Sequence, residues 1–290
     1  MNHQVRAKWM MVSSMAIFGT VGAFVRNIPL SSGEIALWRA VLATVLIGSF
    51  LLITHKPIPF RAIRKQLPLL LFSGMALGLN WILLFEAYKY TSVSAATLSY
   101  YFAPVIVTLV CSLLLHEKMG AKQWLCFIMS TIGIVLITGL GNIRSGNSHH
   151  IGILCGLGAA VLYATVILLN KFIRDVDGIH RTFLQFLASL FALIPYVALT
   201  DGFRLDLLSG IDRGCLLIVG LVHTGITYCL YFTSLKELPG QKVAILSYID
   251  PLVAILVSVL LLHERMTAWQ ILGGMLILGF TCWNEISSTK

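Results

Sequence analysis

The sequence predicts an all-α integral membrane protein, with ten transmembrane helices arranged as two inverted five-helix repeats. Its 290 residues are 58% hydrophobic and only 11% charged, whereas soluble domains carry about 25% charged residues. Apolar runs of about 20 residues, each long enough to cross a bilayer as a helix, recur along the whole chain. The two halves of the chain also share a long motif at a constant spacing.

This motif contains a proline in each half. Residues 97–105 (TLSYYFAPV) match residues 244–252 (AILSYIDPL), and each stretch runs on to a Leu-Leu-His-Glu-basic sequence. Pro104 matches Pro251, and every matched pair is separated by the same 147 positions (251 − 104). At one matched position the second copy carries Asp250 where the first copy has an alanine. The chain is therefore interpreted as two copies of one unit that differ in charge at this position.

Ten apolar runs are expected to cross the membrane. They occupy residues 9–26, 34–54, 67–88, 94–115, 121–140, 151–170, 180–200, 213–234, 241–262 and 267–284. Residues 1–140 are predicted to form the first repeat (spans 1–5) and residues 151–290 the second (spans 6–10), with residues 141–150 as the connecting loop. The first run follows two basic residues and lacks a small-residue cleavage site, which favours a retained span over a signal peptide.

Glycine pairs inside two of the runs suggest close helix packing. Gly74-x-x-x-Gly78 and Gly152-x-x-x-Gly156 each leave a small-residue face on which another helix can approach closely. Ten spans provide enough partners within one chain, so intramolecular packing is expected. A dimer face is the alternative, and the protein is expected to be a monomer or a homodimer in the lipid bilayer.

The distribution of lysine and arginine predicts the orientation of the spans. With the N-terminus in the cytoplasm, the inside segments contain fourteen of these residues and the outside segments six, while Arg39 lies within a span. The positive-inside rule therefore places both termini in the cytoplasm of a multi-pass plasma-membrane protein. Because five is an odd number, the second repeat enters from the opposite side, and inverted repeats of this kind place a binding site near the bilayer midplane.

Composition and motifs also exclude several classes of function. The net charge of +9 comes from basic residues in short loops, so a nucleic-acid partner is not expected. The cysteines lie in or beside apolar runs without CxxC spacing, which argues against a metal site or disulfides. No Walker A, H-E-x-x-H or G-x-S-x-G sequence is present, so neither an ATP-driven pump, an enzyme nor a cofactor is expected.

Several short sequences resemble those of a known family. They are Leu37–Ala40 (LWRA) in span 2, Phe85–Thr91 (FEAYKYT) leading to Tyr101–Pro104 (YFAP), and the two Leu-Leu-His-Glu-basic endings. With the five-plus-five repeat, the chain resembles the EamA-type transporters of the drug/metabolite transporter superfamily over nearly its whole length. The resemblance implies a secondary carrier, often an exporter, in which spans 1, 3, 4, 6, 8 and 9 line the cavity and spans 5 and 10 are scaffold.

Asp250 is the foremost candidate for a functional residue. It lies about nine residues into span 9, or about 13 Å at 1.5 Å per residue, which is close to the midplane of a hydrocarbon core of about 30 Å. A charge at that depth costs about 2.5–3.5 kcal/mol, so the carboxylate must be protonated, paired or exposed to water. Each condition suits a proton-coupling or substrate-amine site; the alternative is a structural carboxylate bound by Ser, Tyr or His neighbours.

Pro251 follows this carboxylate, and it is a predicted hinge together with Pro104. A proline has no N–H, so Pro251 leaves a backbone carbonyl about one turn earlier, that of Leu246 or Ser247, without its helical donor. A weakened helix near the midplane is where carriers bind their ligands. We therefore expect spans 4 and 9 to flex at these prolines.

Three other charged or titratable residues are candidates of a different kind. His223 lies at a similar depth to Asp250 on the preceding span, and the two could form a proton relay, although a satisfied core histidine is the alternative. Arg39 and Glu86 are expected to form an ion pair or a gate near the outer ends of spans 2 and 3. Arg39 could instead pair with Glu34, reach the interface, or attract a substrate carboxylate.

The remaining substrate candidates are three pairs of repeat partners, Trp81 with Tyr228, Asn80 with Thr227, and Tyr101 with Tyr248. Aromatic rings combined with amide and hydroxyl groups near mid-membrane suit a mostly apolar or aromatic metabolite. Ordinary helix packing is the alternative for any single ring.

These observations predict a secondary active transporter, more specifically an exporter, of small organic metabolites such as amino acids or related compounds. It would work by alternating access, either coupled to protons or as a facilitated carrier. A carrier of nucleotide-linked or lipid-linked substrates from the same superfamily is the first alternative. An integral membrane enzyme or sensor is the second, and it would require three or more reactive polar groups at one membrane level.

Overall fold

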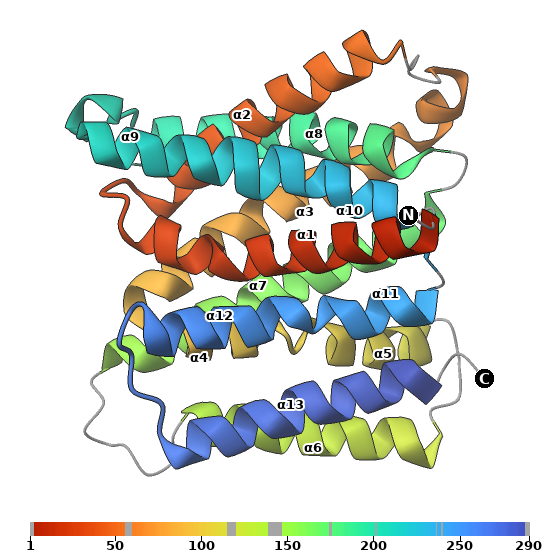
Figure 1. Ribbon diagram of the computed structural model, residues 1–290, viewed down its shortest axis with the longest axis vertical. Coiled ribbons are helices and arrows are strands. Elements are labelled where there is room, and N and C mark those ends of the chain that lie inside the picture. The colour runs from red at the N-terminus through yellow and green to blue at the C-terminus, as the bar shows by residue number, and fades with distance from the viewer. Residues whose placement is uncertain are drawn as a thin grey trace.

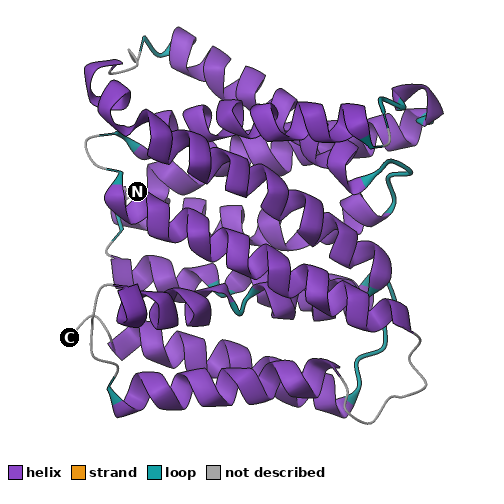
Figure 2. Cartoon of the chain, turned by 180° about the vertical axis from the view of Figure 1, so that it is seen from behind, coloured by secondary structure: helices purple, strands orange, loops and turns teal. Residues whose placement is uncertain are grey.

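The computed structural model describes residues 3–55, 60–114, 120–138, 147–173, 176–200, 202–235, 237–238 and 240–287. Within these ranges the chain is almost entirely helical and contains no β-strand (Figure 2). The Leu-His-Glu-Lys sequence at residues 115–118, which ends the first copy of the motif, lies outside the described residues, as do residues 141–146 of the predicted connecting loop.

Helices of both halves run side by side through the molecule (Figure 1). Those of the first half are α1 (His3–Arg26), α2 (Ser32–Ile53), α3 (Phe60–Tyr90), α4 (Val93–Tyr100), α5 (Ala103–Leu114) and α6 (Ala121–Thr138). Those of the second half are α7 (Asn147–Phe172), α8 (Gly178–Leu199), the short 3-10 helix η1 (Leu205–Leu207), α9 (Gly210–Leu217), the π-helix η2 (Ile218–Ile226), α10 (Thr227–Leu235), α11 (Gly240–Ser247), α12 (Ile249–Leu260) and α13 (Ala268–Ser287). Helix α1 begins and α13 ends at the same end of the bundle.

Seven of the described helical segments are long and apolar enough to cross a membrane. They lie within or close to α1, α2, α3, α4–α5, α7, α8 and α9–α10, and shorter apolar helices cover Ala121–Ile137 and Ile249–Leu260. Large apolar side chains such as Trp9, Leu52 and Trp269 lie exposed on the outside of the bundle. An outer surface of this kind matches the apolar interior of a bilayer.

Two of the predicted spans are interrupted at matched positions. The turn Tyr101-Phe102 separates α4 from α5, and Tyr248, which lies 147 positions after Tyr101, separates α11 from α12. Pro251 has no N–H to donate to the Ser247 carbonyl one turn earlier, which is one of the two carbonyls expected from the sequence. The prolines therefore explain why both helices stop and restart inside the bundle.

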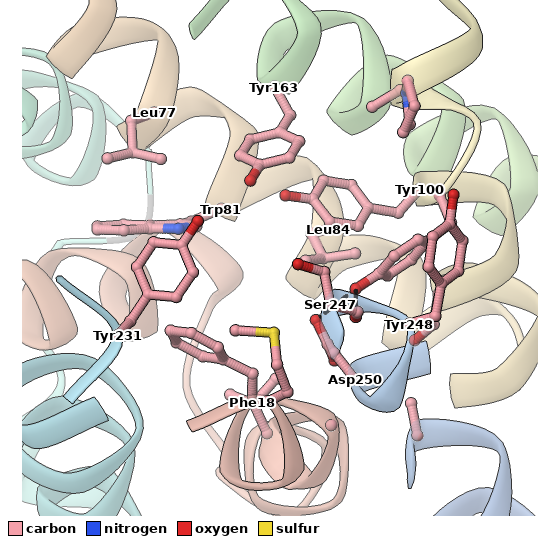
Figure 3. A pocket seen from close by; sticks show the side chains of 18 of the residues that line it. Phe18, Leu77, Trp81, Leu84, Tyr100, Tyr163, Tyr231, Ser247, Tyr248 and Asp250 are labelled. Atoms are coloured by element: carbon pink, nitrogen blue, oxygen red, sulfur yellow. Dashed lines mark hydrogen bonds between the residues drawn. The ribbon is translucent and has the colours of Figure 1, made fainter. Parts of the chain in front are cut away.

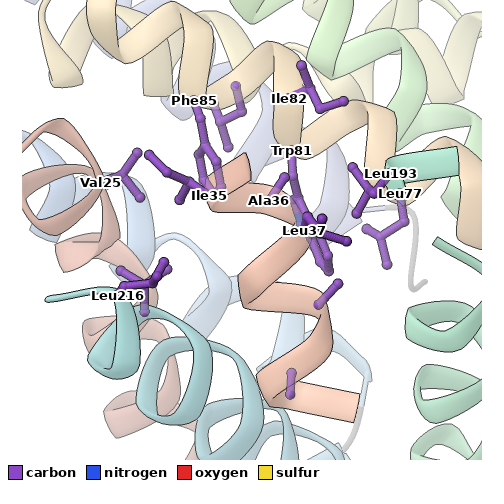
Figure 4. Close-up of a cluster of buried hydrophobic side chains, with 14 of the residues drawn as sticks. Val25, Ile35, Ala36, Leu37, Leu77, Trp81, Ile82, Phe85, Leu193 and Leu216 are labelled. Carbon is purple, nitrogen blue, oxygen red and sulfur yellow. The ribbon is translucent and has the colours of Figure 1, made fainter. Parts of the chain in front are cut away.

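The largest buried cluster joins α2, α3 and α8 (Figure 4). Ile35, Phe85, Phe186 and Leu193 are fully buried in it, and Trp81 is only 3% exposed. This cluster fixes the position of α2 and α3 relative to the second half of the chain.

Glycines allow the closest helix contacts, as the sequence predicts. A Cβ atom on Gly74 would lie 2.5 Å from the Ala188 side chain and 2.5 Å from the Gln185 carbonyl oxygen of α8. One on Gly152 would lie 2.7 Å from Thr91 at the end of α3. The expectation that these glycines serve packing within the chain is confirmed.

Replacing Gly74 by alanine should destabilise the protein, because the added methyl group meets the backbone of α8. Overpacking of this kind costs about 1–3 kcal/mol. Gly279 of α13 is the matched control, since a Cβ atom there has no neighbour within 4 Å and alanine should gain about 0.5–1 kcal/mol in a helix. Thermal unfolding in detergent should show a lower melting temperature for Gly74→Ala and an equal or higher one for Gly279→Ala. Equal melting temperatures for the two variants would contradict the close contact.

Candidate functional site

A cavity of about 330 Å³ lies in the middle of the bundle (Figure 3). It is lined by side chains of α1, α2, α3, α7 and α10 and by both interrupted helices, α4–α5 and α11–α12. Its volume is at the lower end of the range for small-molecule sites, about 300–1,000 Å³. The helices that the family resemblance implies as lining all contribute, and α2 joins them through Arg39.

Nine aromatic side chains line the cavity. They are Phe18, Trp81, Tyr88, Tyr100, Tyr101, Tyr163, Tyr228, Tyr231 and Tyr248. The hydroxyl groups of Tyr100 and Tyr163 both point toward the hollow in Figure 3. Tyr163 was not among the sequence candidates because its repeat partner is an alanine, although it is the only aromatic residue of span 6.

Trp81 and Tyr228, the repeat partners predicted from the sequence, converge on one ring. Both line the cavity, and Phe186 of α8 packs between them at ring-centre distances of 5.3 and 5.2 Å in edge-to-face contacts. This geometry is favourable for aromatic pairs. From the sequence, lining of a cavity and ordinary helix packing are alternatives for these residues. In the structure both side chains line the cavity and also pack against Phe186.

Asp250 lies in the first turn of α12, at the break in the second interrupted helix. Its Oδ2 accepts a hydrogen bond of 2.7 Å from the Tyr101 hydroxyl, which lies at the break in the first. The same hydroxyl is 3.5 Å from the Ser247 carbonyl oxygen that Pro251 leaves without its helical donor. Among the described residues, no cationic group lies within ion-pair distance of Asp250. The carboxylate thus faces the cavity with one neutral donor.

Arg39 of α2 reaches the same cavity while being only 4% exposed. Its Nε donates a hydrogen bond of 2.6 Å to Thr224 Oγ1 in η2. Its guanidinium carbon lies 4.5 Å from the ring centre of Trp81 and 5.5 Å from that of Phe85. Trp81 and Asp250 lie on opposite sides of the hollow in Figure 3, and the Arg39 guanidinium lies over the ring of Trp81.

The ion pair expected for Arg39 is not formed. Glu86 instead accepts a hydrogen bond from the Ser32 hydroxyl. Glu34 accepts one of 2.8 Å from the backbone N–H of Arg204. The physical reason is direction, because the side chain of Arg39 points into the bundle toward η2, while both carboxylates bind groups at the starts of helices or in loops. A gating role for Arg39 and Glu86 stays a prediction.

His223 does not line the cavity and does not contact Asp250. Its ring is buried against Phe24, with Nε2 2.8 Å from Thr20 Oγ1 of α1 and Nδ1 3.3 Å from the Ile218 carbonyl oxygen. Both ring nitrogens therefore have partners away from the cavity. The direct Asp–His relay considered from the sequence is not formed in this structure.

Asn80 and Thr227 also lie outside the cavity lining. Asn80 Nδ2 donates a hydrogen bond of 2.6 Å to the Ala159 carbonyl oxygen of α7. The Thr227 hydroxyl donates one of 2.7 Å to the Val222 carbonyl oxygen within its own helical segment. Both side chains are fully buried, or nearly so, and their polar atoms bond to backbone carbonyl oxygens of helices.

Of the predicted residues, the structure brings seven to the cavity: Arg39, Trp81, Tyr101, Pro104, Tyr228, Tyr248 and Asp250. Five others lie outside its lining: Asn80, Glu86, His223, Thr227 and Pro251.

A polar cluster joins three helices at the end of the bundle opposite to the start of α1 (Figure 1). Glu264, which follows α12, accepts a hydrogen bond of 2.9 Å from the backbone N–H of Val93 in the first turn of α4. It also forms an ion pair with Arg26 at the end of α1 and accepts a hydrogen bond from Ser258. In the sequence this acid is only part of the Leu-Leu-His-Glu-basic ending of the second copy, but the structure shows that it connects the two halves of the chain.

Comparisons with known proteins agree with this architecture. The EamA-like transporter family matches the chain twice, at residues 6–139 and 150–284. The uncharacterized transporter YxxF of Bacillus subtilis is 32% identical over 268 residues, which cover 92% of this chain and 85% of the relative. An uncharacterized transporter of Archaeoglobus fulgidus is 28% identical over 279 residues, covering 94% and 95% of the two chains.

More distant similarities extend over most of the chain as well. Solute carrier family 35 member G1 of the mouse is 23% identical over 278 residues, which cover 92% of this chain and 74% of the relative. A protein of known crystal structure superposes with a TM-score of 0.65 over 98% of both chains at 15% identity, a similarity that shows the fold alone. With the family matching both halves, the chain is a multi-pass membrane protein that belongs to the EamA-like transporter family.

Proposed function

We propose that this protein is a secondary carrier that exports small organic metabolites, such as amino acids or related compounds, across the plasma membrane by alternating access. The cavity is the observation that supports this function best. It lies midway along the bundle, is walled by aromatic rings, and carries Arg39 over the ring of Trp81 and Asp250 across the hollow from that ring. A few charged groups in a mostly aromatic pocket orient a small amphiphilic solute while the rings surround its apolar body.

The topology that accompanies this proposal has ten spans in two inverted repeats of five, over residues 1–140 and 151–290, with both termini in the cytoplasm. Two features support it. Helices are interrupted at matched positions beside the prolines of the repeated motif, and the two breaks lie next to each other in the wall of one cavity. In addition, the family matches each half of the chain separately. Inverted repeats that meet at a midplane site allow the two halves to rock about the bound solute.

Alternating access requires that one end of the cavity be closed while the other is open. The cluster around Glu264 supplies the closing contacts at one end, because it ties α1, α4 and the segment after α12 together. Beneath it, α1 packs against the break in the second interrupted helix, where a Cβ atom on Gly19 would lie 2.5 Å from the Asp250 carbonyl oxygen. In the proposed topology this is the outer end.

Size favours a small solute over the nucleotide-linked or lipid-linked substrates considered as an alternative. A cavity of about 330 Å³ accommodates a molecule the size of an amino acid, whereas a nucleotide joined to a second group needs a larger site.

Counterflow in proteoliposomes with a panel of amino acids, amines and nucleotides tests the proposal. Exchange of one small solute class would support it, and exchange of nucleotide-linked solutes alone would replace it with the alternative. Absence of any flux would favour the enzyme or sensor alternative.

Asp250→Asn should abolish transport that a pH gradient drives. Asparagine has nearly the same shape but cannot exchange a proton, so we expect counterflow of solute to persist while coupled flux is lost. The measurement is uptake into proteoliposomes with an internal pH dye. Tyr101→Phe is the matched control, because it removes the donor to Asp250 and keeps the carboxyl group, and its coupled flux should be retained. An unchanged pH dependence in Asp250→Asn would remove this residue from coupling and leave a facilitated carrier.

Glu264→Gln should shift the carrier toward a state that is open at the end where the cluster lies. The amide cannot form the ion pair with Arg26, so the contacts that close this end are weakened. A cysteine introduced at Ala254, which lines the cavity, should react several-fold faster with an impermeant maleimide added from that face, in a cysteine-free background. Glu237→Gln, an exposed acid outside the cluster, is the control. Equal labelling rates in both variants would show that Glu264 does not close the cavity.

A further inference from the structure

We infer that Arg39 is an anion subsite, which binds a carboxylate group of the transported solute. This inference rests on the proposed function, since it names the chemistry that the carrier's cavity selects. The observation behind it is a buried cation that faces a cavity with most of its hydrogen-bond donors unused. From the sequence a substrate carboxylate is only one of several alternatives for Arg39, and the family similarity assigns no ligand to this residue.

The described residues provide a hydrogen-bond acceptor for only one edge of the Arg39 guanidinium. Nε donates to Thr224 Oγ1, whereas the two Nη groups have no hydrogen-bond partner among the described residues. No carboxylate of those residues lies within ion-pair distance of Arg39 either. A buried charge without a partner is costly, so a complementary charge is expected to arrive with the ligand.

Asp250 does not serve as this counter-ion. It lies across the cavity from Trp81, over which the guanidinium sits (Figure 3). It also accepts its hydrogen bond from Tyr101 on its own side of the cavity. The cavity therefore presents a cation and an anion that are separated by the space a solute would occupy.

Helix η2 determines the direction of the guanidinium. The Thr224 hydroxyl donates its single proton to the Val219 carbonyl oxygen at 2.8 Å, so its oxygen is an acceptor for Arg39 Nε. Gly220 allows η2 to approach α2 closely, because a Cβ atom there would lie 2.5 Å from the Leu42 side chain. With Nε fixed in this way, the Nη edge is left as a preorganised fork of N–H donors.

A fork of two N–H groups matches the two oxygens of a carboxylate. A phosphate monoester would place up to two negative charges beside one guanidinium, and Arg39 is the only lysine or arginine among the residues that line the described cavity. Trp81 and Phe85 stabilise the cation through their ring faces. The ligand class that fits is thus a small organic carboxylate with an apolar body, and an ammonium group on the same solute would point toward Asp250.

Ligand-induced thermal stabilisation of the purified carrier tests this inference without relying on transport. The probes are matched pairs, 3-phenylpropionate with 3-phenylpropanamide, and L-phenylalanine with L-phenylalaninamide. Each pair keeps the shape of the molecule and replaces the carboxylate by a neutral amide, and the first pair contains no amino group whose charge could change as well. We expect the carboxylates to raise the melting temperature in a concentration-dependent manner and the amides to bind about tenfold more weakly or worse. Equal stabilisation by both members of each pair, or none by either carboxylate, would overturn the inference.

Variants of Arg39 and Thr224 distinguish the loss of an anion site from a general loss of packing. Arg39→Gln should lose the carboxylate-specific stabilisation, while Arg213→Gln, an exposed arginine of α9, should keep it. If Arg39→Gln fails to fold, Thr224→Val provides the second test, because it leaves the cation in place and removes the oxygen that orients it. In Thr224→Val, the difference in thermal stabilisation between each carboxylate and its amide should be smaller than in the wild type. A preference that survives in both Arg39→Gln and Thr224→Val would assign the anion to another residue.

Failure of this inference and failure of the carrier function give different results. If carboxylates stabilise the wild type and not Arg39→Gln, but no organic solute moves in counterflow, the anion site stands and the carrier proposal falls. If amines or neutral solutes are exchanged at rates that Arg39→Gln does not change, and the carboxylates give no stabilisation, the carrier stands without the anion site.

Discussion

Inside a bilayer, a backbone polar group that loses its helical partner must find another one within the protein, and this constraint explains where the cavity lies. Pro104 and Pro251 each remove an N–H from an apolar helical segment of the bundle. Both helices stop four residues before these prolines, at Tyr100 and Ser247, and both breaks face the same enclosed space. The Tyr101 hydroxyl, from one break, lies against the Ser247 carbonyl and the Asp250 carboxylate of the other. A polar cavity is therefore the place where two interrupted helices can exist in an otherwise apolar bundle.

The same need for partners governs the two charges in the cavity. Asp250 has a neutral hydroxyl donor, and Arg39 has a neutral hydroxyl acceptor and two aromatic faces. Neither charge is neutralised by a direct contact within the described residues, although both lie among side chains that exclude most water. Separated charges of this kind favour a solute that bears complementary groups at a matching distance. The aromatic side chains of the cavity provide contact area for the apolar body of such a solute.

Close packing at glycines and polar contacts between the halves explain how such a cavity can be both enclosed and mobile. In lipid, helices associate through van der Waals contact and hydrogen bonds rather than through the hydrophobic effect. Gly74 gives such contact within the large cluster of α2, α3 and α8, which involves extensive buried surface. The cluster of Glu264, Arg26 and the first turn of α4 involves a few polar groups only. The second kind of contact is easier to break.

The sequence by itself determined the helical membrane class, the matched proline positions and the carboxylate beside the second proline, because hydropathy, proline chemistry and a fixed repeat spacing are properties of the chain alone. It also indicated that Trp81, Tyr228, Tyr101 and Tyr248 belong to one site. Only the tertiary structure decided which polar residues face that site. Asn80, Thr227 and His223 lie at a similar depth to the cavity residues, yet each turns to a helix carbonyl or to a neighbouring helix, while Arg39 turns inward to Thr224 rather than to Glu86. Depth follows from counting residues along a span, but direction depends on how each helix is rotated against its neighbours and on where a π-helix such as η2 shifts the register.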